Sequence, residues 1–97
     1  MTVIPTTTED GEGLAVDALA ELVDRLMKSG AVGYVDAVSA LLSITASMAA
    51  MFVSEHARPS FPDGAADDLR DRIRRAMKDE SIKAARSRIA FEPLMVH

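Results

Sequence analysis

Few side chains in this sequence of 97 residues could carry acid–base, nucleophilic or metal chemistry. The chain has two histidines and no cysteine, which excludes disulfides, thiolate metal sites and cysteine nucleophiles. His56 directly follows Glu55, and neighbours on a helix point about 100° apart, so these two side chains do not form a chelating pair. No H-x-x-x-H, H-E-x-x-H or D-x-D spacing occurs. His97 is the last residue of the sequence.

His56 is still the most suggestive single residue. It is predicted on the apolar side of a helix, one turn after Phe52, near the helix end. It could act there as a general base or metal ligand, or as a favourable charge at the negative end of the helix dipole. The serines have no base at a usable spacing, and the glycines form no phosphate loop. We therefore predict no catalytic, cofactor-binding or metal-ligating residues, and keep an enzymatic use of His56 as the lesser alternative.

A basic run near the end of the sequence is the strongest candidate for binding. Residues 70–88 carry eight basic and three acidic side chains, whereas residues 1–69 carry three basic and eleven acidic ones. Arg70, Arg74 and Lys78 recur at i, i+4 and would align on one side of a helix. Such a row suits phosphates or an acidic protein partner, although the acidic and basic parts could also face each other inside the fold.

Other features weigh against nucleic acid as the partner. The i, i+4 pairs Asp68–Arg72 and Asp71–Arg75 would neutralise part of the same helix. No aromatic residue is interleaved for base stacking, and the chain contains no Asn and no Gln, the usual readers of adenine. Binding of nucleic acid or of an acidic partner by residues 70–88 is therefore the alternative function.

The elements that must position these residues are helical. From about residue 10 or 12 to residue 29, apolar residues recur with a helical period, and charged residues occupy the opposite side. Glu21–Arg25 and Asp24–Lys28 are predicted i, i+4 pairs, and Gly30 is a natural residue to follow the helix end. This segment is predicted as an amphipathic helix.

A second helix is predicted from residue 34 to about residue 57. It contains "AVSALLSITASMAAMFVS" (residues 37–54), eighteen residues without a charge, of which ten are Ala, Ser or Thr. A helical wheel divides this stretch by side-chain size. One side, the large face, gathers Val38, Leu41, Leu42, Met48 and Phe52 with the methyl group of Thr45. The other side, the small face, consists of Ser39, Ser43, Ala46, Ser47, Ala50 and Ser54.

The uncharged stretch raises the question of a membrane span. Eighteen residues is the short end of what crosses a bilayer, and four serines and a threonine cost free energy in hydrocarbon. The flanking charges show no clear positive-inside asymmetry, and residues 1–13 do not resemble a signal peptide. We therefore expect a cytoplasmic protein in which the large face fills a core and the small face meets a second copy.

The rest of the chain is broken by prolines at 59 and 62. Asp63 is the predicted N-cap of a third helix, and a kink or a new helix is expected between residues 79 and 81, where the apolar stripe changes phase. Residues 1–9 and 92–97 are expected to be loose or extended. The segments "TVIP" (residues 2–5) and "AFEPLMVH" (residues 90–97) could pair as a small two-stranded ribbon.

Together these features predict one all-α domain over residues 1–97, a compact bundle of three to four helices. The predicted function is that of a small non-enzymatic adaptor, regulator or inhibitor that acts through protein–protein contacts. It would form a homodimer through the small face and bind an unidentified protein partner. No cofactor and no association with a membrane are expected. Arg70, Arg74 and Lys78 are the predicted contacts to an anionic or acidic partner.

Overall fold

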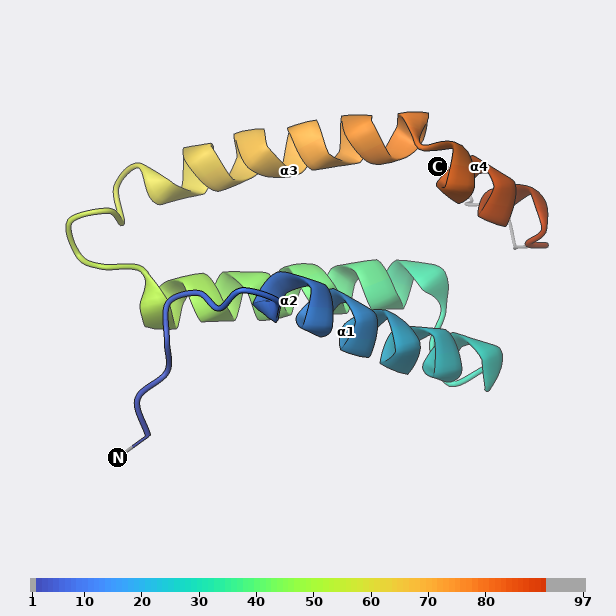
Figure 1. Ribbon diagram of the computed structural model, residues 1–97, viewed down its shortest axis with the longest axis horizontal. Coiled ribbons are helices and arrows are strands. Elements are labelled where there is room, and N and C mark those ends of the chain that lie inside the picture. The colour runs from blue at the N-terminus through green and yellow to red at the C-terminus, as the bar shows by residue number, and fades with distance from the viewer. Residues whose placement is uncertain (1, 91–97) are drawn as a thin grey trace. The chain divides into compact units, whose positions relative to one another are not determined.

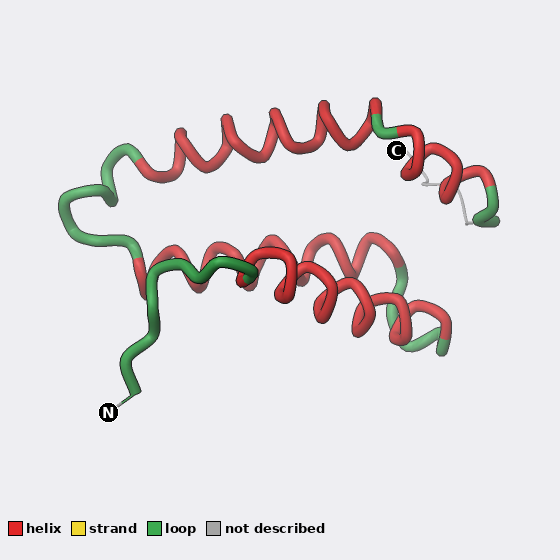
Figure 2. Tube along the Cα trace, viewed as in Figure 1, coloured by secondary structure: helices red, strands yellow, loops and turns green. Residues whose placement is uncertain are grey.

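The computed structural model describes residues 2–90 and is helical throughout its regular parts (Figures 1 and 2). Four α-helices follow one another along the chain: α1 (Gly11–Lys28), α2 (Tyr34–Phe52), α3 (Phe61–Lys78) and α4 (Glu80–Ser87). No strand occurs among residues 2–90. The all-α class predicted from the sequence is confirmed. The ribbon predicted between the chain ends involves residues 91–97, which lie outside the described residues.

The chain divides into two compact units, residues 1–52 and residues 53–97. The first unit holds α1 and α2, which contact each other and run in opposite directions (Figure 1). The second holds α3 and the short α4, which also contact each other. The prediction of a single domain stays a prediction.

Helix α1 ends in a hydrogen-bonded turn that only glycine adopts easily. Gly30 has φ +80°, in the left-handed region that disfavours residues with a Cβ. Its N–H donates to the carbonyl of Met27 at 3.1 Å, and the N–H of Ala31 donates to the carbonyl of Leu26 at 3.2 Å. These two bonds form a Schellman motif and satisfy carbonyls at the helix end. The role predicted for Gly30 is confirmed.

Helix α2 begins with a side-chain hydrogen bond across its first turn. The Asp36 carboxylate accepts the N–H of Gly33 at 3.0 Å, and the N–H of Ala37 donates to the carbonyl of Gly33 at 3.0 Å. An acidic residue in this turn also faces the positive end of the helix dipole. Residues 29–33 thus form a short connection whose polar groups are bonded locally.

The end of α2 differs from the prediction. The helix stops at Phe52 rather than near Ala57. The carbonyl of Ser54 instead accepts the N–H groups of Ala57 at 3.0 Å and Arg58 at 3.1 Å, which forms a separate turn. Pro59 has no N–H and restricts Arg58 before it, so a helix through this segment would lose hydrogen bonds at its end. Sequence periodicity did not show where the break falls.

The start of α3 also differs. The helix begins at Phe61 with Ser60 as its N-cap, so the predicted cap Asp63 lies inside its first turn. Pro62 occupies the first turn, where a helix needs no N–H donor and the fixed φ of proline is already suitable. Asp63 instead stabilises the positive end of the helix dipole.

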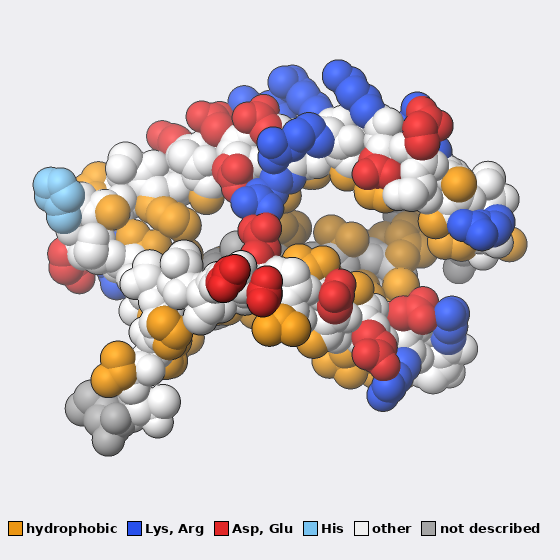
Figure 3. Space-filling model, viewed as in Figure 1, with side chains coloured by type: hydrophobic (Ala, Val, Ile, Leu, Met, Phe, Trp, Pro, Cys, Tyr) orange, Lys and Arg blue, Asp and Glu red, His pale blue; other side chains and the backbone are white. Residues whose placement is uncertain are grey.

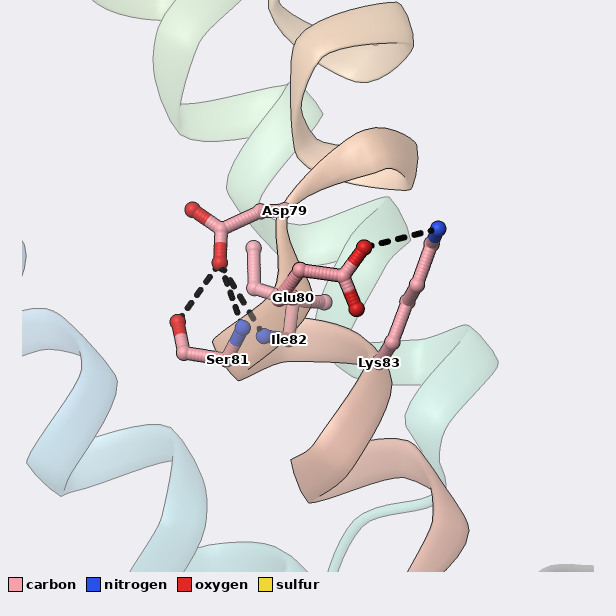
Figure 4. A network of polar contacts seen from close by, with 5 residues as sticks. All are labelled: Asp79, Glu80, Ser81, Ile82 and Lys83. Carbon is pink, nitrogen blue, oxygen red and sulfur yellow. Dashed lines mark hydrogen bonds and ion pairs between the residues drawn. The ribbon is translucent and has the colours of Figure 1, made fainter.

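A sharp junction at Asp79 separates α3 from α4, as the phase change in the sequence predicted (Figure 4). Asp79 has an extended ψ of 121° and caps α4. Its Oδ1 atom accepts the N–H of Ser81 at 2.9 Å, the hydroxyl of Ser81 at 2.6 Å and the N–H of Ile82 at 3.2 Å. The bond from the Ser81 hydroxyl, followed by the two backbone bonds, lowers the pKa of Asp79 below its ordinary value of 3.8.

Burial is very low in this structure. Among the described residues, Ala37 is the one hydrophobic residue that is buried, with 7% of its surface exposed. Large apolar side chains of all four helices remain at least partly accessible, for example Leu26 of α1 at 39% and Leu69 of α3 at 42%. An amphipathic helix gains most of its stability by covering its apolar side, so these helices have surfaces still to bury.

Candidate functional site

Both faces of α2 are accessible. On the large face, Leu42 is 49% and Phe52 is 58% exposed. Every residue of the small face is exposed as well. Five of its six residues lie within α2, whereas Ser54 follows two residues after the helix end. The structure therefore presents α2 as an apolar helix whose two sides differ in side-chain size.

Thr45 fits the large face because its polar group is satisfied locally. Its hydroxyl donates to the carbonyl of Leu41 one turn earlier at 2.9 Å. A threonine bonded in this way directs its methyl group outward and leaves no donor to be covered. Thr45 is thus compatible with an apolar environment around the large face.

Helix α2 is long and apolar enough, by length and composition alone, to cross a membrane. Its 19 residues have a mean hydropathy of 1.6 and correspond to a length of about 28 Å. The core helix of a soluble protein passes the same test, but such a helix is mostly buried, and α2 is not. What covers α2 is therefore the central functional question for this chain.

Helix α1 shows the complementary pattern of an apolar side and a neutralised polar side. Its outer surface carries the two predicted ion pairs, Arg25 with Glu21 at 2.5 Å and Lys28 with Asp24 at 2.9 Å. Both pairs are exposed and contribute little to stability. Hydrophobic side chains remain visible on the surface of α1 (Figure 3).

The predicted cationic row on α3 is split by ion pairing. Arg70 forms an ion pair with Asp67 at 3.0 Å, an i, i+3 pair that periodicity at i, i+4 did not indicate. Among the described residues, Arg74 and Lys78 have no ion pair. The row therefore contains one neutralised and two available cations.

A third available cation lies beside that row. Arg72 forms its predicted pair with Asp68 at 2.7 Å. The predicted pair between Asp71 and Arg75 is absent, so within residues 2–90 Arg75 has no carboxylate partner. The last turns of α3 thus hold three available cations, Arg74, Arg75 and Lys78. Acidic side chains lie nearer the start of the helix (Figure 3).

His56 lies outside α2 and not on its apolar side, because the helix ends four residues earlier. It is exposed, in the turn that spans residues 55–60. Its neighbour Glu55 pairs with Arg58 at 3.4 Å rather than with the imidazole. Among residues 2–90 no group of three or more His, Cys, Asp or Glu side chains is placed to hold a metal ion.

Comparison with known proteins adds no functional information: no family model, no curated protein and no solved structure matches this chain. Function is therefore inferred from the exposed helical faces and their charges.

Proposed function

We propose that this chain is a small, non-enzymatic, cytoplasmic interaction protein that buries its apolar helical faces by associating with a second copy of itself. The observation that carries this proposal is the exposure of the apolar faces. Ala37 is the single buried hydrophobic residue among residues 2–90. A chain with about half of its residues hydrophobic needs to cover more than this.

The large apolar side chains exposed on α2 represent enough area for their burial to stabilise the protein substantially. Eight large hydrophobic side chains of this helix, from Val35 to Phe52, are at least 36% exposed. Complete burial of one such side chain contributes about 1.5–3 kcal/mol, so covering the exposed half contributes roughly 1 kcal/mol each. The sum is comparable to the net stability of a small domain, which is about 5–15 kcal/mol.

The two faces of α2 suit different neighbours. The large face fits the apolar stripe of α1, the helix that α2 already contacts. The small face lets another backbone approach closely, because Ser and Ala side chains are short. A second α2 related by a two-fold axis would present the same face, which makes the contact self-complementary.

Protein is a better covering than lipid for this helix. Ser39, Ser43 and Ser47 repeat along one side of α2, where hydrocarbon would offer their hydroxyls no partner beyond their own helix. Asp36 lies in the first helical turn, and the last turn has no basic residue to anchor the helix at a membrane surface. The α2 surface therefore favours a protein–protein contact.

A heterologous protein partner would then meet the charged surfaces. Asp17, Glu21 and Asp24 line the outer side of α1, where they would attract a basic partner. The second candidate function is binding of an anionic partner by residues 70–88. It is favoured by the absence of ion pairs at Arg74, Arg75 and Lys78 within the described part of the chain.

Light scattering on a size-exclusion column tests the proposal, with absorbance recorded at 260 and 280 nm and no detergent present. We expect a dimer without nucleic-acid absorbance. Ala50→Arg, on the small face near the end of α2, should give a monomer, whereas Ala18→Arg on exposed α1 should remain a dimer. A monomeric unsubstituted protein would overturn the homodimer, and aggregation relieved only by detergent would favour a membrane span.

A further inference from the structure

Helix α3 combines an apolar stripe with cations that have no ion pair. Leu69, Ile73 and Met77 recur at i, i+4 and are 42%, 46% and 70% exposed. Arg74, Arg75 and Lys78 occupy the remainder of the same turns, and among residues 2–90 none of them has a carboxylate partner. The second half of α3 thus offers an apolar stripe on one side and positive charge on the opposite, polar side.

The first half of the helix does not share this character. Two of its carboxylates pair with cations further along the helix, Asp67 with Arg70 and Asp68 with Arg72. Within each pair the two charges neutralise one another, so the net positive charge of α3 lies from Arg74 onward. In α4, the Lys83 ammonium approaches Glu80 at 3.4 Å and adds little to the surplus.

We infer that the second half of α3 binds the surface of an anionic lipid bilayer. The interface of such a bilayer provides both complements: negative headgroups for the cations and an acyl boundary for the stripe. Helices that lie in such an interface carry Lys and Arg on the polar side and insert the opposite, apolar side toward the acyl chains. The cytoplasmic leaflet carries negative surface charge, so the inference is compatible with the cytoplasmic location proposed above.

Nucleic acid matches only half of this surface. Its phosphates would engage Arg74, Arg75 and Lys78, but a duplex has no apolar layer to cover Leu69, Ile73 and Met77. Bases of a single strand would need aromatic side chains to stack on, and residues 62–88 contain none. The exposed apolar stripe therefore favours a lipid bilayer over nucleic acid as the partner of α3. This inference does not depend on self-association through α2.

Sedimentation of the full chain with lipid vesicles tests the inference. We expect binding to vesicles of phosphatidylcholine mixed with phosphatidylglycerol, weak binding to phosphatidylcholine alone, and a loss of binding as salt is raised. Each cation near an anionic surface contributes roughly a fivefold factor, so Arg74→Ala/Lys78→Ala should weaken partitioning about 25-fold. The matched control Arg25→Ala/Lys28→Ala removes the same residue types from α1 and should leave partitioning unchanged.

A second pair of variants tests the role of the stripe. Ile73→Ser/Met77→Ser should reduce partitioning into the mixed vesicles, with circular dichroism confirming that the helices remain. Equal binding to both vesicle types that survives the Arg74→Ala/Lys78→Ala substitution would overturn the inference and point to insertion of α2. Binding of labelled duplex DNA that vesicles do not displace would overturn it in favour of nucleic acid.

Discussion

Helices α2 and α3 are nearly equal in length, but they are two-sided in different ways. In α2 the two sides differ in size, and Asp36 is its single charged residue. In α3 the two sides differ in polarity, with cations and carboxylates opposite an apolar stripe. Both helices leave apolar surface exposed, so the hydrophobic effect acts on each of them. In the proposals made above, the polar sides select the partner: a close-packed helix for α2 and an anionic surface for α3.

The largest effect that separates the two helices is expected from a buried charge. In the assembled protein, Leu41→Asp would place an unpaired carboxylate within the large face and destabilise the fold by about 3–5 kcal/mol. Met77→Asp on α3 should cost about 1 kcal/mol or less, because Met77 is 70% exposed. Urea denaturation of both variants measures the difference. Equal losses would show that α2 is not the better buried helix.

A smaller effect is expected at the connection between α1 and α2. Gly30→Ala forces a Cβ into a backbone with φ +80° and should cost about 1–2 kcal/mol. Gly13→Ala is the matched control, because Gly13 lies within α1 and an added Cβ meets nothing within 4 Å. That substitution should stabilise the protein by about 0.5–1 kcal/mol. Opposite signs of the two shifts in thermal midpoint would confirm the left-handed turn, and the same sign would contradict it.

The junction between α3 and α4 should respond to acid. The three hydrogen bonds to Asp79 lower its pKa in the folded state below 3.8, so their contribution is complete above that pH. It is lost as the pH falls below 3.8 and through the folded-state pKa. Circular dichroism should show a helicity loss in this range, limited to the share of the eight-residue α4.

Comparison with Asp79→Ala separates this loss from the titration of other carboxyl groups. The variant should have less helix at neutral pH, since the N–H groups of Ser81 and Ile82 lose their acceptor. It should also lack the part of the acid transition that belongs to Asp79. Identical pH profiles for the two proteins would refute the capping role.

The smallest effect is expected from the ion pairs that divide α3. Asp68→Asn removes the pair with Arg72 and should destabilise by about 0.3–0.5 kcal/mol at low salt. Asp71→Asn is the control, because within the described residues Asp71 has no ion pair. Thermal melts at low and high salt should differ more for Asp68→Asn than for Asp71→Asn. If salt changes the thermal midpoints of both variants equally, Asp68 is not paired with Arg72 in preference to Asp71 with Arg75.

Sequence reasoning was most successful where a local pattern repeats. The period of α1, the glycine after it and the phase change near Asp79 each correspond to an observed feature. It was less successful at boundaries where two local signals compete. Helix α2 ends at Phe52 because the next carbonyls form their own turn, and α3 begins at Phe61 because a proline in a first turn costs nothing.

The sequence predicted which residues make up the candidate surfaces. It did not predict which of them lie within a helix or which of them form ion pairs. The small face of α2 could be listed from the wheel, yet the helix end leaves Ser54 outside it. The cationic row could also be listed, but a choice between rotamers decides which carboxylate pairs with which cation. Asp67 pairs with Arg70, whereas Asp71 and Arg75 do not pair. Such choices differ by a few tenths of a kcal/mol, which residue spacing does not resolve.

The sequence by itself determined the all-α class, the absence of cysteine chemistry and the two-sided character of α1, α2 and α3, because these follow from residue types and a 3.6-residue period. Only the three-dimensional structure decided where α2 stops, that Asp79 caps α4 and that the apolar faces of the helices remain partly exposed. Burial depends on which surfaces meet. Periodicity shows that a helix has a face to bury, but not what covers that face.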